Sequence, residues 1–525
     1  MMYDKTKHNI ILLTDATDMM TMQKALGTYK IAYELRQAGF QVVVLNHLHV
    51  FSLEEVFHYL KELVNEKTLF VGINNIFYQQ ISEPIITEEN NIYYTPSKPG
   101  AMLPHGLDKN DQLVKYIKEL NPNCALVLGG ASAHDAYYNK EYDYIVTGYA
   151  DLSVVNLARH LQDKSVLIEK SHRSIFGPII ITDSKADGFN FSQSTMRYEP
   201  QDGILKGEVL PIEIARGCIF KCTFCSYPLN GKKKLDYVKD SEILYREFID
   251  NYEKFGTTRY SFVDDTFNDS LEKCKMIYDI SKRLPFKLEY WAYIRLDLLA
   301  AHPKTIDWLF DSGLRGCFFG IETFNQATGS LIGKGGKRER IIETLRYIKS
   351  RWGNESMLHG SFIFGLPHES LNSMQQTVDI LLSPDSPLDS FHLKALRIKA
   401  NKDNWTNGFL ADIDINFEKY GYQNLGATGL DMLWKNEHTS YEQVKQIVND
   451  THEVGNRAGT RVISSSYVFD LASLGYPLSY VANKIVSEFD WHETMLRKAS
   501  RAKEYKTRLC VTLNINPFEQ ATEKV

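Results

Sequence analysis

The N-terminal part of the chain alternates short apolar runs with stretches of helical period. The runs NIILLTD, FQVVVLN, TLFVGI and CALVLGG are typical of strands that are buried on both faces. The stretches between them, such as GTYKIAYELRQAG and SLEEVFHYLKELVNE, repeat their apolar residues with the period of an amphipathic helix. This alternation predicts a doubly wound parallel α/β domain, which we place at residues 1–170.

A second alternating series follows a less regular stretch. Residues 171–206 have little periodicity and are predicted to be a linker. Over residues 207–400, helical stretches separate six runs of strand type, which are LPIEIARG, RYSFVDD, KLEYWAYIR, GCFFGIE, LHGSFIFGLP and SFHLKALRI. Such a series of β/α units predicts a partial (β/α)6 barrel. Sites on this fold gather at the C-terminal ends of the strands.

The pattern becomes mostly helical after residue 400. The clearest helical stretches are SYEQVKQIVNDTHEVGNRAG and PLSYVANKIVSEFDWHETMLRKASRAKEYK. We therefore expect a helical capping domain at residues 401–525. A chain of 525 residues is too long for one hydrophobic core, which agrees with this division into several domains.

Composition and charge are those of an ordinary globular protein. The chain has 43% hydrophobic and 24% charged residues and a formal net charge of -5. Because no strong positive field is present, neither nucleic acid nor an anionic membrane is an expected partner. The start MMYDKTKHNIILLTD is polar before a short apolar run, and no apolar run approaches ~18 residues. We expect a cytoplasmic protein.

Three of the seven cysteines lie together in the segment RGCIFKCTFCSY. The other four are scattered, which is not the pattern of a disulfide framework. Three thiolates can bind zinc with a fourth ligand from elsewhere, or a cubane iron-sulfur cluster that keeps one iron without a protein ligand. The spacing CxxxCxxC directly after a strand and a glycine favours the cluster, and Phe224 should shield it.

The segment RGCIFKCTFCS resembles the cysteine motif of the radical S-adenosylmethionine (SAM) superfamily, and the predicted partial barrel agrees with that resemblance. The resemblance implies a [4Fe-4S] cluster on Cys218, Cys222 and Cys225. In that family the fourth iron is chelated by the amino and carboxylate groups of SAM. Reductive cleavage of SAM then gives a 5′-deoxyadenosyl radical that abstracts hydrogen from the substrate.

Further residues at the predicted strand ends match segments of the same family. The resemblance assigns cofactor contacts to Asp265 in FVDDTFN, to Arg295 in WAYIRLD as the partner of the SAM carboxylate, and to Glu322 in FFGIET. In FIFGLPHES it assigns a backbone approach to the adenine around Gly365, with Glu369 tightening the turn. For Asp265 the alternative is a role in a helix cap, and for Arg295 it is an exposed ion pair. For the segment FIFGLPHES the alternative is a purely structural loop. The segment IGKGGKRER, which follows Glu322, resembles the KGH stretch of the cobalamin-associated branch of the superfamily, and it is equally compatible with a solvated basic helix start.

The N-terminal domain resembles that of cobalamin-binding radical SAM proteins. The likeness lies in GTYKIAYELRQAGFQVVVLN, in LVLGGASAHD with Gly129 and Gly130, and in YDYIVTGYAD with Gly148, and it implies cobalamin contacts at these glycines. The sequence departs from the pattern of these proteins in two places. The first loop, DATDMMTMQKALG, lacks the DxHxxG motif that supplies a histidine to cobalt, and GYAD stands in place of GEGE. The alternative to cobalamin binding is that the N-terminal domain is a degenerate scaffold that binds no cofactor. Isolated loop histidines, which are His47, His49 and His134, are expected on the polar surface.

Together these features predict a radical SAM enzyme that methylates an unactivated carbon with the help of cobalamin. The substrate should be a small molecule or peptide, and the electron donor a flavodoxin or ferredoxin. A cobalamin-independent rearrangement, dehydrogenation or ring closure is the nearest alternative. A zinc-stabilised nucleic-acid-binding protein is the alternative from another class, and it leaves the polar strand ends unexplained. No catalytic residue is assigned from the sequence.

Overall fold

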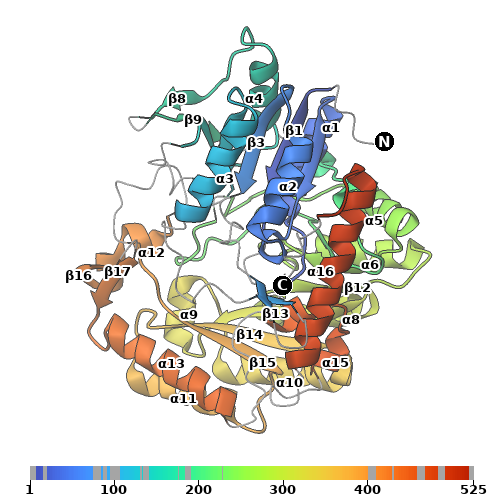
Figure 1. Ribbon diagram of the computed structural model, residues 1–525. Coiled ribbons are helices and arrows are strands. Elements are labelled where there is room, and N and C mark those ends of the chain that lie inside the picture. Colours follow the sequence, from blue (N-terminus) through green and yellow to red (C-terminus); the bar gives the residue numbers. More distant parts are fainter. Residues whose placement is uncertain are drawn as a thin grey trace.

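The computed structural model describes most of the chain, and the statements below concern these residues only: 7–15, 21–74, 84–86, 92–94, 107–130, 133, 141–174, 177–183, 191–227, 229–399, 410–428, 431–457, 467–482 and 491–518. Their helices and strands form two large sheets with covering helices, and Figure 1 shows the N-terminal sheet above the second sheet. The fold class predicted from the sequence is confirmed.

The N-terminal sheet has seven strands in the order β2-β1-β3-β6-β7-β9-β8. All pair in parallel except β8 with β9. The strands are β1 (Asn9–Leu13), β2 (Gln41–Leu45), β3 (Thr68–Asn74), β6 (Ala125–Gly129), β7 (Tyr144–Gly148), β8 (Ser171–Arg173) and β9 (Ile179–Asp183). The predicted linker thus supplies two strands, so the sheet extends beyond residue 170.

Four helices accompany this sheet: α1 (Leu26–Gln37), α2 (Leu53–Leu63), α3 (Leu107–Leu120) and α4 (Ser153–Gln162). Helix α2 begins at a capping box, in which Ser52 and Glu55 each accept a hydrogen bond from the other's backbone nitrogen. The chain order reverses between β1 and β3, which leaves a crevice at their C-terminal ends. A small antiparallel pair, β4 (Pro84–Ile86) with β5 (Ile92–Tyr94), lies outside the main sheet.

The second sheet has six parallel strands in sequence order, as expected for the partial barrel. They are β10 (Leu210–Ile212), β11 (Arg259–Phe262), β12 (Glu289–Ile294), β13 (Leu314–Glu322), β14 (Met357–Phe364) and β15 (Ser390–Ala395). The helices between them are α5 (Ser241–Phe255), α6 (Leu271–Arg283), α7 (Leu296–Ala301), α8 (Lys304–Asp311), α9 (Gln326–Ile332), α10 (Arg338–Trp352) and α11 (Leu371–Leu382).

The two faces of the barrel strands are distinct. On β12, Tyr290, Ala292 and Ile294 belong to the main core that includes residues of the outer helices, such as Cys274 and Ile277 of α6. The residues between them therefore face the interior of the barrel, because successive side chains of a strand point to opposite faces. The register extends this alternation to β13, β14 and β15.

The C-terminal part is mostly helical, as predicted, and also contains an antiparallel hairpin of β16 (Gln423–Thr428) and β17 (Asp431–Lys435). Its helices are α12 (Asp412–Ile415), α13 (Tyr441–Arg457), α14 (Tyr467–Ser473), α15 (Leu478–Ala482) and α16 (Trp491–Leu513). Figure 1 shows α16 running alongside both sheets. It reaches the N-terminal domain through Lys506, whose Nζ lies 2.6 Å from Oε2 of Glu55.

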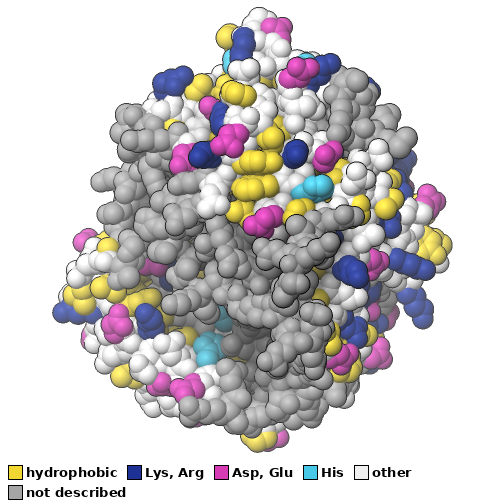
Figure 2. All heavy atoms as spheres, in the orientation of Figure 1, with side chains coloured by type: hydrophobic (Ala, Val, Ile, Leu, Met, Phe, Trp, Pro, Cys, Tyr) yellow, Lys and Arg dark blue, Asp and Glu magenta, His cyan; other side chains and the backbone are white. Residues whose placement is uncertain are grey.

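Short 3-10 helices complete the structure, at Leu48–Val50, Phe191–Gln193, Pro200–Asp202, Leu235–Tyr237, Gly353–Glu355 and Phe417–Tyr420. On the described part of the face in Figure 2, Lys and Arg side chains alternate with Asp and Glu. Among the described helices, none has the length and apolar character needed to cross a membrane.

Candidate active site

The loop after β10 carries the three clustered cysteines and is tied back on itself. The nitrogen of Cys218 donates to the oxygen of Leu229 at 3.1 Å, and the nitrogen of Lys232 donates to the oxygen of Cys218 at 3.0 Å. Gly217 has φ +124°, and a Cβ there would lie 2.8 Å from the oxygen of Leu229. Only glycine fits this close approach. The loop therefore presents its cysteines at the C-terminal edge of the barrel.

All three cysteines are free thiols. Burial raises the pKa of Cys218 and Cys225. The sulfur of Cys218 lies 3.4 Å from Oγ1 of Thr266, which follows β11. Cys222 receives a hydrogen bond from Nη1 of Arg295 at 3.6 Å. These contacts orient the sulfurs at the strand ends, where a bound metal would be needed to hold them as thiolates.

The donors of the cysteine loop suit a [4Fe-4S] cluster. A cubane bound by three thiolates takes one thiolate on each of three irons, and its fourth iron has no protein ligand. Three free thiols with the spacing CxxxCxxC in one loop provide these donors.

The two aspartates after β11 have different environments. Asp264 is buried, and its Oδ1 accepts hydrogen bonds from the nitrogens of Ile214 at 3.1 Å and Ala215 at 2.5 Å. It holds the backbone that leads into the cysteine loop. Asp265 is half-buried, and burial raises its pKa to about 6. Its charge also contributes to the raised pKa of Cys218 and Cys225, so Asp265 lies near the cysteine loop.

Arg295 lies against the cysteine loop. Its guanidinium is paired with Asp297 through Nη2 at 2.6 Å, donates from Nη2 to the oxygen of Gly333 at 3.0 Å, and lies 3.6 Å from the ring centroid of Phe220. Cys222 is a further partner of Arg295. The described contacts of the Arg295 side chain are thus with the cysteine loop and with residues that adjoin this loop. Its role toward the SAM carboxylate stays a prediction.

Glu322 ends β13 in an unusual backbone conformation, with φ +68°. Its Oε1 lies 3.7 Å from Nζ of Lys334, and Lys334 also donates to the oxygen of Gly320 at 2.8 Å. Burial raises the pKa of Glu322, and Lys334 opposes that rise. A Cβ at Gly320 would lie 2.7 Å from Oε1 of Glu322. Lys334, in the segment IGKGGKRER, therefore forms part of the Glu322 environment and is not simply a solvated helix start.

Glu369 fixes the turn after β14. Its Oε2 accepts from the nitrogens of Gly365 at 3.0 Å and Leu366 at 3.1 Å, and its Oε1 accepts from Oγ1 of Thr323 at 2.6 Å. Gly365 has φ +83°, and a Cβ there would meet Trp434 at 2.5 Å. The close approach at Gly365 is thus made by Trp434 of β17. An additional approach to adenine stays a prediction.

Phe224 is half-buried and packs on the main core. Its role as a shield of the cluster is not tested by these contacts. Phe220, which sequence reasoning did not select, is the aromatic residue of the loop that stacks on Arg295. Thr266 and Thr323 were also missed, and their signal in the sequence is a position shortly after a predicted strand. Lys334 lies in the segment IGKGGKRER, for which no residue was assigned a role.

The C-terminal edge of the N-terminal sheet is joined to the cysteine loop. Arg216, two residues before Cys218, donates to Asp151 after β7 at 2.7 Å and to Glu213 at 2.8 Å. Gln23, in the segment between β1 and α1, donates to Oγ of Ser261 on β11 at 2.7 Å. The two sets of strand ends therefore face one another.

The predicted glycines lie at the ends of β6 and β7. Gly129 and Gly130 follow one another at the end of β6, and Gly148 ends β7. All three are half-buried, and Gly130 and Gly148 have φ +103° and +85°. Among the described residues, a Cβ at Gly129 would meet the oxygen of Val146, at 4.0 Å. Contacts of cobalamin with these three glycines stay a prediction.

The expectation that His47 and His49 are polar surface residues is wrong. Both are buried, with 1% and 0% of their surface exposed. His49 is paired with Asp15, and the ring of His47 lies 5.1 Å from the ring of Tyr505 on α16. The C-terminal helix covers the ends of β1 and β2 and thereby buries them. His134, and residues 16–20 of the loop compared with DxHxxG, lie outside the described residues.

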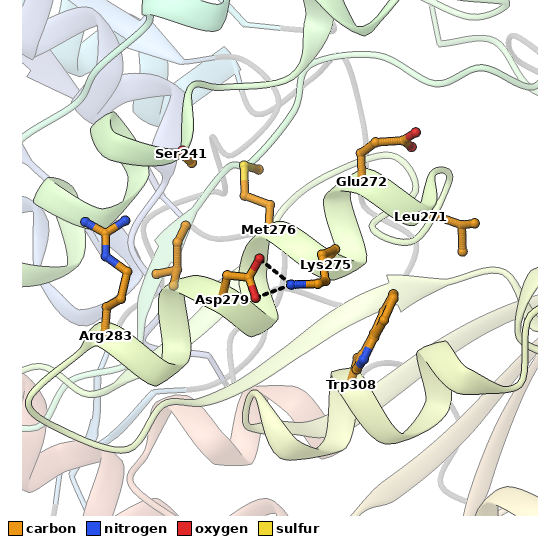
Figure 3. A pocket seen from close by; sticks show the side chains of 9 residues that line it. Ser241, Leu271, Glu272, Lys275, Met276, Asp279, Arg283 and Trp308 are labelled. Carbon is orange, nitrogen blue, oxygen red and sulfur yellow. Dashed lines mark hydrogen bonds and ion pairs between the residues drawn. The ribbon is translucent and has the colours of Figure 1, made fainter.

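A groove of about 480 Å³ lies on the outer side of the barrel (Figure 3). It is lined by residues of α5, α6 and α8, among them the ion pair of Lys275 with Asp279 and the ring of Trp308. None of the predicted site residues contributes to it. The groove is therefore separate from the strand-end site.

The comparisons with known proteins match this geometry. Residues 212–381, which include the cysteine loop and the ends of β11 to β14, match the family model described as the Radical SAM superfamily. The chain contains a radical SAM domain. This domain implies a [4Fe-4S] cluster and SAM as cofactors.

Two curated relatives are methyltransferases. The chain is 25% identical over 254 residues to an uncharacterized methyltransferase of Pyrococcus horikoshii. The aligned region covers 48% of this chain and 51% of the relative. It is 24% identical over 177 residues to the bacteriochlorophyllide d C-12(1)-methyltransferase of Chlorobaculum tepidum. Here the aligned region covers 33% of this chain and 38% of the relative. The chain thus matches about half of these relatives' length or less.

One similar solved structure extends over nearly the whole chain. It is the radical SAM methyltransferase TsrM from Kitasatospora setae, solved with its tryptophan substrate and a SAM analogue. The TM-score is 0.63 at 14% identity, and the match covers 95% of this chain and 100% of TsrM. At this identity the likeness concerns the fold, and it includes the N-terminal sheet as well as the radical SAM domain.

Proposed function

We propose that the protein is a radical SAM enzyme that transfers a methyl group to an unactivated carbon of its substrate with the help of cobalamin. The observation that carries the proposal is the CxxxCxxC loop at the C-terminal edge of a six-stranded parallel barrel. A bound [4Fe-4S] cluster would supply the electron that cleaves SAM reductively to methionine and a 5′-deoxyadenosyl radical.

The residues of the chain have distinct tasks in this proposal. Cys218, Cys222 and Cys225 would bind three irons, and the hydrogen bond from Arg295 would place positive charge beside Cys222. The buried Glu322 is suited to accept hydrogen bonds from the amino group of SAM, because its ion-pair partner Lys334 lies 3.7 Å from Oε1, longer than a hydrogen bond. Asp265, with a pKa near 6, is the second acidic side chain at this edge.

The N-terminal domain supports the part of the proposal that concerns cobalamin. At the crevice between β1 and β3, Nδ2 of Asn74 donates to Oγ1 of Thr28 at 2.9 Å, and Thr28 donates to Thr14 at 3.2 Å. The glycine ends of β6 and β7 lie on the same edge of the sheet. Such an edge suits a large polar ligand, and the structure of TsrM has also been solved with cobalamin and a [4Fe-4S] cluster.

The remaining partners follow from the chemistry. The substrate is a small molecule that enters the interior of the barrel, and an external one-electron donor, such as a flavodoxin or ferredoxin, must reduce the cluster. A reactive carbon radical requires that water and stray hydrogen donors be kept away from it, and the facing strand ends would provide this enclosure.

The test is an anaerobic assay of reduced, reconstituted protein with SAM, with and without methylcobalamin. We expect 5′-deoxyadenosine to form, and we expect cobalamin to bind with a change in its visible spectrum. Cobalamin binding without 5′-deoxyadenosine would contradict the radical step. 5′-Deoxyadenosine without cobalamin binding would favour the alternative, a rearrangement, dehydrogenation or ring closure that uses SAM alone.

A further inference from the structure

The interior face of the barrel carries a row of side chains that the cofactor residues do not account for. Phe391 and Leu393 of β15 are buried in the core beneath the outer helices, so His392 and Lys394 face inward. The register places Ser361 of β14 opposite His392. The same alternation on β12 and β13 directs Tyr293 and Phe318 inward.

The interior is closed at its lower end and open toward the strand ends. Phe469 of α14 stacks on Trp291 with ring centroids 4.6 Å apart, and 2% and 7% of these side chains are exposed. Higher on the same face, Tyr293 is 37% exposed and Lys394 is exposed. Helix α14 therefore closes the lower end of the barrel interior, and the accessible side chains of Tyr293 and Lys394 lie nearer the C-terminal ends of the strands.

One part of the inner face of the barrel, on β12 to β14, is aromatic. The rings of Tyr293 and Phe318 lie 4.7 Å apart, and Phe318 lies 4.8 Å from the ring of His359. Burial raises the pKa of Tyr293 to about 12 although its side chain is accessible. A side chain that is accessible and also desolvated lines an enclosed space. This part of the inner face offers a flat apolar surface for the substrate.

The edge strand β15 of the same sheet carries a cation, Lys394, on its inner face. Within the described part of the chain, Lys394 forms no hydrogen bond and no ion pair. Burial lowers its pKa, and so does Arg397, while Glu322 opposes the decrease. Burial also keeps His392, two residues earlier, in its neutral form, with a pKa of about 3. Glu322 is thus an acidic neighbour of Lys394, but no hydrogen bond or ion pair joins the two side chains. A bound anion would give this cation a direct partner.

We propose that Lys394 binds the carboxylate of the substrate, while His392 and Ser361 donate hydrogen bonds beside it and Tyr293 and Phe318 hold a flat apolar body. The substrate class is thus an aromatic or similarly planar carboxylic acid. This inference rests on the proposed function, which needs a substrate beside the cysteine loop. Because SAM carries a carboxylate too, the test must distinguish the two sources.

The test is calorimetric titration of the full-length protein with 2-naphthoate and with its neutral analogue 2-naphthamide. We expect 2-naphthoate to bind at least tenfold more tightly than the amide, since a charge-assisted hydrogen bond contributes this much or more. Lys394→Met should remove the difference. The matched control Lys445→Met, on the exposed side of α13, should preserve it.

Three outcomes overturn the proposal: no binding of 2-naphthoate, equal binding of the acid and the amide, or a preference for the acid that persists in Lys394→Met. A parallel titration of reconstituted protein with SAM gives the other arm. If Lys394→Met weakens SAM binding tenfold and leaves 2-naphthoate unchanged, Lys394 belongs to SAM and the proposal fails. The naphthoate titration needs neither cluster nor turnover, so its result is independent of whether the protein cleaves SAM.

Discussion

Replacing Glu369 by glutamine should remove a pH dependence from the stability of the barrel. Burial raises the pKa of Glu369 from 4.5 to about 7, in spite of the hydrogen bonds from Thr323 and from the backbone nitrogens of Gly365 and Leu366. The folded state therefore holds the proton more tightly than the unfolded state. The stabilisation is complete below pH 4.5 and is lost as the pH rises through 7.

The size of the effect follows from that difference. At 1.36 kcal/mol for each pH unit, a pKa raised from 4.5 to about 7 corresponds to about 3 kcal/mol of unfolding free energy. A glutamine at this position can accept both backbone hydrogen bonds with its oxygen and donate to Thr323 with its nitrogen. It can replace the protonated carboxyl group and has no charge to desolvate.

The assay is thermal unfolding of both proteins between pH 5 and pH 8.5. We expect the melting temperature of Glu369→Gln to exceed that of the wild type by about 3 °C at pH 8.5, and the difference to fall to about a quarter of that value at pH 5. Glu369→Ala is the control, because it leaves the same donors without an acceptor and should destabilise the protein at every pH. A constant difference between glutamine and wild type across the range would refute the reasoning.

Three further substitutions test other parts of the site. Gly320→Ala should reduce 5′-deoxyadenosine formation at least tenfold, because its Cβ would displace the adjacent glutamate, whereas a Cβ at Gly335 meets nothing within 4 Å and Gly335→Ala should be neutral. Arg216→Met leaves two buried carboxylates without their shared cation and should lower the unfolding free energy by about 3 kcal/mol, measured by chemical denaturation. Arg295→Met removes the donor to a cysteine sulfur and should lower iron retention after gel filtration; unchanged retention would contradict that role.

The sequence pattern predicts much of the fold because periodicity records burial directly. The six barrel strands and the cysteine loop appear where the apolar runs and the CxxxCxxC spacing place them. The strands β8 and β9 were missed because SHR is short and fully exposed, and because no helix separates the two strands. Local pattern carries no information about such pairing at the end of a sheet.

Contacts between distant segments were equally hard to predict. His49 and His47 read as loop residues, yet α16 returns more than 400 residues later and buries them beneath Tyr505. Lys334 read as the start of a solvated helix because its partner Glu322 can be recognised only when the turn after β13 is known. In both cases the sequence shows a residue's type and local setting, while tertiary packing decides its environment.

Iron and sulfide analysis of the anaerobically reconstituted protein tests the central claim most directly. The account predicts about four irons and four sulfides per chain, with a large loss in Cys222→Ala and no loss in Cys124→Ala, whose thiol is buried in the N-terminal core. It further predicts that SAM changes the electron paramagnetic resonance spectrum of the reduced cluster. Zinc without sulfide in the wild type, or full iron content in Cys222→Ala, would contradict the account.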